Sequence, residues 1–173
     1  MSEFIRLAKQ RYSCRMLTDR PVEKEKIDLI IEAGMCAPTA ANYQPFRIFV
    51  MESEEALSKV KSFCRQPFIH PAPAVFIIGA DPHAAWTRHI DGKNFAEVDA
   101  SIVATQMMLE IQDLGLGTTW IGHFECEEIK EAFPEMKGYS LIAMFAVGYP
   151  AENAAVSPMH EKSKPESDLV IRY

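Results

Sequence analysis

The chain has 173 residues, of which 48% are hydrophobic and 24% are charged, and its formal net charge is −6. This composition is typical of a globular domain with a buried core and argues against a disordered or fibrous chain. The acidic balance also argues against nucleic acid or an anionic membrane as a partner, because both attract basic proteins.

The first half of the chain is expected to alternate between helix and strand. Ser2 can cap a short helix, after which residues 11–22 show no regular period. Apolar residues return at helical spacing over 23–37, and Pro38 ends that helix because proline restricts the residue before it. Three further elements are predicted: a strand over 46–52, an amphipathic helix over 53–63 and an apolar strand over 73–80.

The second half opens with a polar excursion, residues 81–94, before a long helix over 95–114 that is apolar around much of its circumference. We therefore expect this helix to be buried at the centre of the fold. Gly115 is expected to cap it. The remaining predicted elements are a strand within 114–122, a short helix over 127–133, a buried strand over 139–150 and a terminal strand over 167–173.

No repeat or linker divides the chain, so one domain over 1–173 is expected. Its tail, residues 151–173, is long and polar before the terminal strand. That strand could return to its own sheet or cross to another subunit.

The N-terminus carries charges too early for a signal peptide, and no apolar stretch approaches the roughly 18 residues of a membrane span. Isolated thiols without metal-like spacing suit a reducing compartment. We therefore expect a cytoplasmic protein with neither a disulfide framework nor a zinc site. The four cysteines are Cys14, Cys36, Cys64 and Cys126.

The segment 37–46, APTAANYQPF, places small residues between two prolines. A loop that terminates a helix explains it in the ordinary way. The alternative is a surface where bare backbone approaches a flat ligand. The pattern alone leaves both interpretations open.

Arg11, Ser13 and Arg15 alternate in RYSCR, so an extended backbone would point all three to one side. The rigid donor fork of arginine suits phosphate or carboxylate oxygens, which makes this a candidate anion pocket. A pair of ordinary surface arginines is the simpler account of R-x-x-x-R alone. Lys162 and Lys164 could complete the pocket only if the tail folds back.

The stretch LGLGTTWIGHF is no dinucleotide fingerprint, because G-x-G-x-x-G is absent and no helix follows directly. A helix cap followed by a buried strand explains Gly115 and Gly117. It explains Gly122 and His123 less well.

Neither a metal site nor a catalytic side chain is expected. His83 and His89 are six residues apart in a polar, proline-containing segment and share no helical face. The chain has no G-x-S-x-G elbow and no G-x-x-x-x-G-K-[ST] phosphate loop. A cofactor is therefore the expected carrier of any reaction.

Taken together, RYSCRMLTDRPV, APTAANYQPFRIFV, LGLGTTWIGHF, YSLIAMFAVGYPAE and KSKP resemble, in order and spacing, the nitroreductase family of flavoproteins. These blocks cover nearly the whole chain. The resemblance implies an α+β fold with a central, mainly antiparallel sheet flanked by helices. It also implies an intertwined homodimer that exchanges its C-terminal strand and binds two FMN molecules at the subunit interface.

The resemblance implies roles for individual residues. The phosphate is expected at Arg11, Ser13 and the tail lysines, and Arg15 beside flavin N1 and O2, where a cation favours the reduced, anionic ring. The loop at Pro38 would come from the partner subunit, and the backbone of Gly122 would approach N5. The expected cofactor-binding set is Arg11, Tyr12, Ser13, Arg15, Pro38, Thr39, Ala40, Asn42, Gln44, Ile121, Gly122, His123, Lys162 and Lys164.

Two departures from the family limit what the resemblance implies about substrate. Longer members have a larger helical excursion over the active site, whereas here only 81–94 can serve, so the pocket is expected to be more open. His123 occupies a position where members vary, and it could tune the flavin or simply pack.

The implied function is an FMN-dependent oxidoreductase that takes electrons from NADH or NADPH and passes them to a nitroaromatic, quinone or similar small acceptor by a ping-pong mechanism. One alternative is a specialised flavin reaction, such as reductive dehalogenation or oxygen-dependent flavin fragmentation. A flavin-binding or redox-sensing protein with little turnover is the alternative from another class.

Overall fold

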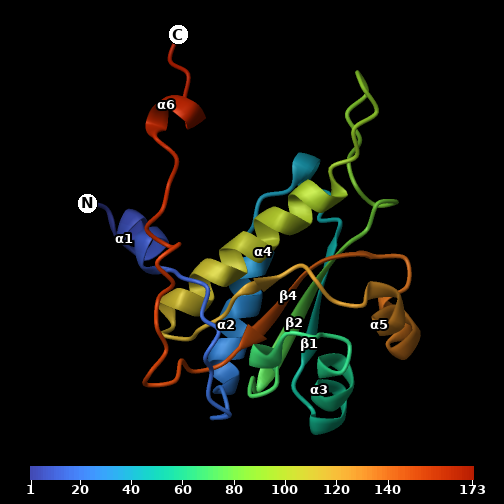
Figure 1. Cartoon of the computed structure of the whole chain (residues 1–173). Coiled ribbons are helices and arrows are strands. Elements are labelled where there is room, and N and C mark those ends of the chain that lie inside the picture. The colour runs from blue at the N-terminus through green and yellow to red at the C-terminus, as the bar shows by residue number, and fades with distance from the viewer.

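A four-stranded antiparallel sheet lies at the centre of the computed structural model, which describes residues 1–173 (Figure 1). The strand order is β1-β2-β4-β3. Every residue of the central strand β2 is buried, and so are the residues of β4 from Ala143 to Val147, in keeping with their uninterrupted apolar sequence. The strands are β1 (Phe46–Met51), β2 (Ala74–Ala80), β3 (Trp120–Ile121) and β4 (Ser140–Val147).

The register of the sheet is continuous except at one point. β1 pairs with β2 from Phe46↔Ala80 to Met51↔Val75. β2 pairs with β4 along its whole length, with a shift between Ile78 and Gly79. The short strand β3 pairs with the C-terminal half of β4 and so forms one edge of the sheet.

Helices α2 (Lys24–Met35) and α4 (Ala96–Asp113) cover one face of the sheet (Figure 1). Successive strand residues point to opposite faces, so Phe76 and Phe145 pack on this side against α4 residues such as Met107. Gly34 of α2 lets the two helices approach closely, because a Cβ there would lie 2.9 Å from the Met107 side chain.

Helices α3 (Glu54–Lys61) and α5 (Cys126–Ala132) cover the opposite face. Ile77 and Met144 point to this side and share a core cluster with Val60 of α3 and Ile129 of α5. The same cluster includes Cys14, which fixes the irregular segment 11–22 against this layer.

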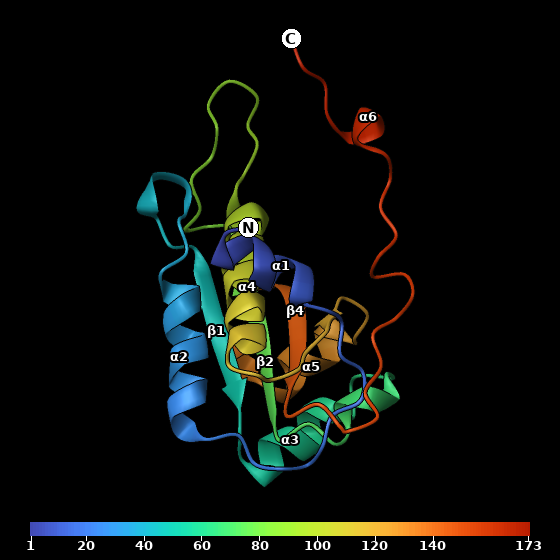
Figure 2. The same cartoon turned by 90° about the vertical axis from the view of Figure 1, so that its left-hand side faces the viewer.

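Helix α1 (Glu3–Gln10) contacts the outer side of α4, and Ser2 caps it as expected by accepting a hydrogen bond from the Ile5 backbone. The last helix, α6 (Glu166–Leu169), stands apart from the body on the tail, whereas residues 81–94 form an arm beyond the start of α4 (Figure 2). Single 3-10 turns are η1 (Ala40–Asn42), η2 (Pro67–Ile69) and η3 (Pro134–Met136). None of the helices is both long and apolar enough to cross a membrane.

The expected α+β class is confirmed, but two expected elements differ. The helix predicted to reach residue 37 ends at Met35, because the Ala37 amide donates to the Gly34 carbonyl, three residues back, and so leaves the α-helical pattern just before Pro38. The strand predicted over 167–173 is wrong for the single chain. Residues through Leu169 form α6, and the tail pairs with none of the four strands. A tail that meets no sheet edge of its own chain satisfies its backbone locally instead.

Candidate functional site

Four residues of the expected cofactor-binding set, including the expected phosphate ligands Arg11 and Ser13, line one cavity of about 390 Å³. Segment 11–15 supplies one side of it, and the tail supplies the other. No carboxylate lines this cavity, although the chain as a whole is acidic. It therefore concentrates positive charge where an anion would bind. The lining residues are Arg11, Tyr12, Ser13, Arg15, Ser157, Met159 and His160.

Backbone pairing holds this irregular segment in place. The Cys14 amide donates to the Thr118 carbonyl at 2.9 Å, and Leu17 forms a bridge with Pro150. Cys14 is buried against Gly117, where a Cβ would lie only 2.8 Å from its sulfur. The glycine therefore allows the close approach that fixes the residues on either side of Cys14.

Tyr12 adds a neutral hydroxyl to the cavity rather than a charge. Partial burial, followed by the neighbouring Cys14 thiol, raises the pKa of Tyr12 to about 12. Arg15 is exposed, and its guanidinium carbon lies 6.0 Å from the Phe68 ring centroid. At neutral pH, the side chains of this segment that carry charge are thus the two arginines.

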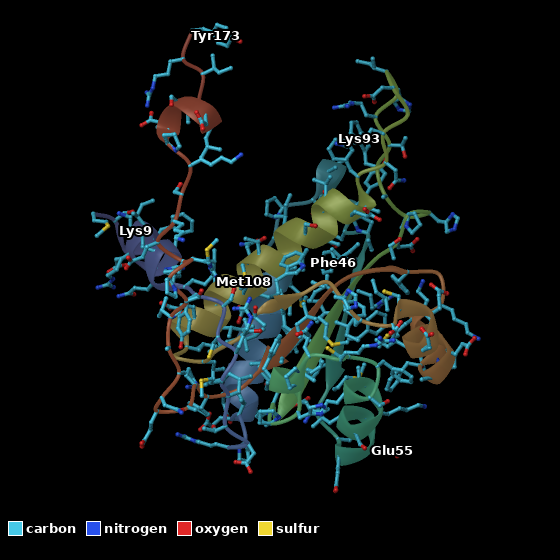
Figure 3. The ribbon with its side chains drawn as sticks, in the orientation of Figure 1. Lys9, Phe46, Glu55, Lys93, Met108 and Tyr173 are labelled. Atoms are coloured by element: carbon cyan, nitrogen blue, oxygen red, sulfur yellow. The ribbon has the colours of Figure 1, made fainter.

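The tail reaches the cavity through residues that sequence reasoning missed. His160 Nε2 lies 2.9 Å from the carbonyl oxygen of Lys9 at the end of α1. Lys162 and Lys164, which were expected at the phosphate, are exposed farther along the tail and do not line the cavity. Figure 3 shows Lys9 on α1 beside the tail and Tyr173 far beyond it. The only signal for His160 was its position two residues before the expected lysine.

Ile121, Gly122 and His123 follow Thr118, whose carbonyl accepts the hydrogen bond from Cys14. Ile121 is buried in the core cluster that contains Cys14, whereas Gly122 and His123 are exposed just after β3. A Cβ at Gly122 would meet nothing within 4 Å, so its surface is open. Backbone in this position can approach a flat ligand.

The loop of residues 38–45 presents its middle to solvent. Ala41, Asn42 and Gln44 have φ values of 51°, 56° and 51°, in the left-handed region. Such a conformation costs about 1–2 kcal/mol for each non-glycine residue, so the surroundings must hold it. Thr39 contributes by accepting a hydrogen bond from the Gln44 amide at 3.0 Å.

Asp99, in the first turn of α4, holds this loop through a hydrogen bond. Its Oδ1 accepts a hydrogen bond from the Ala40 amide at 3.0 Å, and its other oxygen, Oδ2, is buried with no partner. Sequence reasoning missed Asp99, because an acidic residue in the first turn of a helix is common. The signal that could have pointed to Asp99 is the presence of an acidic residue within a helix that was expected to be buried.

The expected site residues therefore form two groups at opposite ends of α4 (Figure 1). Loop 38–45 is tied to Asp99 at the start of the helix, and segment 11–15 is tied to Thr118, just beyond its end. The helix length between Asp99 and Asp113 is about 21 Å. A single chain does not bring the two groups together.

The exposed side of α4 carries an apolar groove. Together with Phe4 of α1, residues of α4 line a cavity of about 680 Å³ on the surface away from the sheet. Phe4 is 61% exposed, and Val98 and Ile102 are each 37% exposed. The long helix expected to be buried at the centre of the fold thus leaves part of its side away from the sheet exposed, where only α1 covers it. No three His, Cys, Asp or Glu side chains lie close enough to hold a metal ion.

Comparison with known proteins places this geometry in a family. The profile of the nitroreductase family matches residues 8–65 and 58–149. The crystal structure of a nitroreductase family protein from Clostridium difficile 630 is 35% identical and superposes with a TM-score of 0.88, with 98% of each chain covered. A Bacillus subtilis protein described as an FMN reductase (NAD(P)H) is 28% identical over 174 residues, which cover 91% of this chain and 70% of that protein.

A protein from Exiguobacterium sibiricum 255-15 in complex with FMN has the same fold, with a TM-score of 0.84 at 21% identity. That match covers 100% of this chain and 98% of the other. The family profile spans both the segment at Arg11 and the loop at Pro38. The family profile and the 35% identical structure each cover most of this chain, so the chain belongs to the nitroreductase family.

Proposed function

We propose that this protein is an FMN-dependent oxidoreductase that uses NADH or NADPH to reduce a nitroaromatic, quinone or similar small acceptor. The observation that carries the proposal is the cavity in which Arg11, Ser13 and Arg15 converge without a carboxylate. The proposal is also supported by the FMN-containing relative and by the FMN reductase named above.

The cavity fits the phosphate of FMN. Guanidinium groups form paired, charge-assisted hydrogen bonds with phosphate oxygens, and the Ser13 hydroxyl can donate one more. Arg15 would then lie toward the ring, where its charge favours the reduced flavin. Lys162 and Lys164 would reach the phosphate only if the tail moves inward from the position that it has in the single chain.

The loop of residues 38–45 fits the flat side of a ring. Its tip offers the small residues Ala41, which is exposed, and Ala40, which is half-buried, and its backbone conformation is held by internal hydrogen bonds. A larger side chain here would push the loop away from a planar ligand. Pro38, Thr39, Asn42 and Gln44 would lie in the same contact.

A site built from both groups needs two copies of the chain. In a two-fold dimer, an antiparallel pair of α4 helices places the start of one beside the end of the other. The groove along α1 and α4 supplies a surface for this contact, because the exposed apolar side chains of Phe4, Val98 and Ile102 would be covered by a second copy of the helix. We therefore propose a homodimer in which loop 38–45 of one subunit completes the FMN site of its partner.

Bound FMN would supply the redox chemistry by accepting a hydride from the nicotinamide and passing electrons to the acceptor. The chain's own residues would bind, orient and tune. Arg11 and Ser13 fix the phosphate, Arg15 provides the charge beside the ring, and loop 38–45 covers one part of it. No side chain is assigned as acid, base or nucleophile.

The test is reconstitution followed by turnover. The purified protein should bind FMN in preference to FAD and oxidise NADH or NADPH when a quinone is added. Parallel double-reciprocal lines are expected, because the nicotinamide and the acceptor need the same exposed face of the flavin. A protein that binds no FMN would end the proposal, whereas FMN binding without turnover on any acceptor would favour a flavin-binding or redox-sensing role.

A further inference from the structure

Asp99 is the only charged residue among the fully buried side chains, with 1% of its surface exposed. It lies in the first turn of α4, where its amide donates to the Phe95 carbonyl at 2.9 Å. The positive end of the helix dipole favours a carboxylate there. Burying a charge is nevertheless expensive, so its presence calls for a reason beyond packing.

The hydrogen bond that Asp99 accepts from the Ala40 amide holds the loop of residues 38–45 to α4. Two hydrogen bonds link the loop of residues 38–45 to distant parts of the chain: this one, and the one that the Asp81 amide donates to the Pro45 carbonyl at 2.9 Å at the far end of the loop. The other bonds in the loop, such as that from Asn42 to the Thr39 carbonyl, are internal. Only the bond to Asp99 joins the loop to α4, so the position of Ala40 relative to the start of this helix depends on Asp99.

The second oxygen of Asp99 shows that stability alone does not explain the residue. Oδ2 is buried without a hydrogen-bond donor, which penalises the folded state. Local costs of this kind are retained where a function requires the geometry they enforce. Here the geometry is that of a loop with three non-glycine residues in the left-handed region.

We infer that Asp99 is a positioning residue for the FMN site. By accepting the Ala40 hydrogen bond, it fixes the position of the loop of residues 38–45 relative to the start of α4, so that the loop can contact the flavin ring. It acts through the loop and does not itself touch the flavin. This inference rests on the proposed function, in which that loop contacts FMN.

The first experiment measures the loop directly, in the FMN-free protein. Hydrogen–deuterium exchange of residues 38–46 should be about tenfold faster in Asp99→Ala, because the lost hydrogen bond involves a charged acceptor. Asp99→Asn keeps an acceptor oxygen of the same shape and should stay within about threefold of the wild type. Asp113→Ala removes an exposed carboxylate from the other end of α4 and should change nothing.

The same hydrogen bond can be removed from the other side. Ala40→Pro deletes the donor while Asp99 remains, and Thr39 is already extended, as the residue before a proline must be. This variant should reproduce the fast exchange of Asn42 and Gln44. The double variant with Asp99→Ala should exchange no faster than either single variant, because both remove one interaction. If Asp99→Ala does not fold, this variant still tests the inference.

FMN titration then links the loop to the site. Asp99→Ala should raise the FMN dissociation constant by about tenfold, and Asp99→Asn should largely restore it. Unchanged loop exchange in Asp99→Ala, or equal damage from Ala and Asn, would overturn the inference. If the wild type binds FMN, an Asp99→Ala variant whose loop exchanges faster but whose FMN affinity is normal would also overturn the inference. If the wild type itself binds no FMN, the proposed function fails, whereas the exchange result still decides whether Asp99 positions the loop.

Discussion

His160 Nε2 lies 2.9 Å from the carbonyl oxygen of Lys9, and no other hydrogen bond joins the chain beyond Ala151 to the rest of the protein. This contact places Ser157 and Met159 opposite Arg11 in the candidate phosphate cavity. The tail wall of the cavity is therefore held by one hydrogen bond, together with the packing of Ala154 against the core cluster that contains Cys14.

We predict that His160→Ala loosens the tail and weakens FMN binding several-fold, because one wall of the cavity loses its anchor. His160→Gln can still donate to the Lys9 carbonyl and should restore much of the affinity. Limited proteolysis of the tail and FMN titration measure the two effects. A tail that becomes sensitive while FMN affinity stays normal would remove this wall from the site.

Replacing Arg15 by Ala should weaken FMN binding by about tenfold and lower the flavin reduction potential, through the loss of a cation beside the ring. Arg65→Ala is a suitable control, because Arg65 is exposed, pairs with Glu125 and does not line the cavity. Spectroelectrochemical titration gives the potential. An unchanged potential in Arg15→Ala with flavin bound would rule out this role for Arg15.

Two glycine substitutions should separate folding from binding. Gly117→Ala should cost about 1–3 kcal/mol of stability, because its Cβ would lie 2.8 Å from the Cys14 sulfur. Gly122→Ala meets no neighbour and should leave stability unchanged while weakening FMN binding through its added methyl group. Urea unfolding of the FMN-free proteins and FMN titration check both. Normal FMN affinity in Gly122→Ala would argue against contact between this backbone and the flavin.

Deleting residues 167–173 tests whether the tail crosses to the partner subunit. Ile171 is 76% exposed in the single chain, as expected of a segment that another subunit covers. The deletion retains every expected FMN contact, yet we predict a weaker dimer and lost flavin together. Sedimentation and flavin fluorescence measure the two, with Arg172→Ala as a control that keeps the apolar residues. A monomer that binds FMN tightly would contradict the shared site.

Stability in acid should depend on Glu23. The Tyr149 hydroxyl, the local backbone and Arg20 stabilise its carboxylate and lower its pKa from 4.5 to about 2. Because the folded state holds the charged form more tightly, the contribution is complete above about pH 5 and is lost as the pH falls toward about 2. The stability difference between wild type and Glu23→Gln should shrink across that range. A stability difference that stays constant across that range in urea unfolding would contradict this role of Glu23.

The order of helices and strands was predictable from sequence because their signals are local. The cap at Ser2, the uninterrupted apolar run of β2 and the break at Pro38 each depend on a few neighbouring residues. The terminal strand was predicted from apolar character alone. A strand also needs an edge to pair with, and no edge of the single chain receives the tail.

The candidate site was predictable in part. Arg11, Ser13 and Arg15 could be grouped because an alternating pattern within five residues fixes their relation. His160 and Asp99 could not be placed, because their contacts join residues 151 and 59 positions apart in the chain. Such pairings depend on the path of the tail and on the packing of α4 beneath the loop, neither of which leaves a local pattern.

Because the two groups lie at opposite ends of α4, each subunit of the proposed dimer contributes segment 11–15 to one flavin and loop 38–45 to the other. Consider a hybrid dimer of one Arg15→Ala subunit and one Asp99→Ala subunit. One site receives both defects, whereas the other draws a normal arginine segment from one subunit and a normal loop from the other. Two variants that each bind FMN weakly would thus complement each other when co-assembled, because one of the two sites in every hybrid molecule would regain normal affinity.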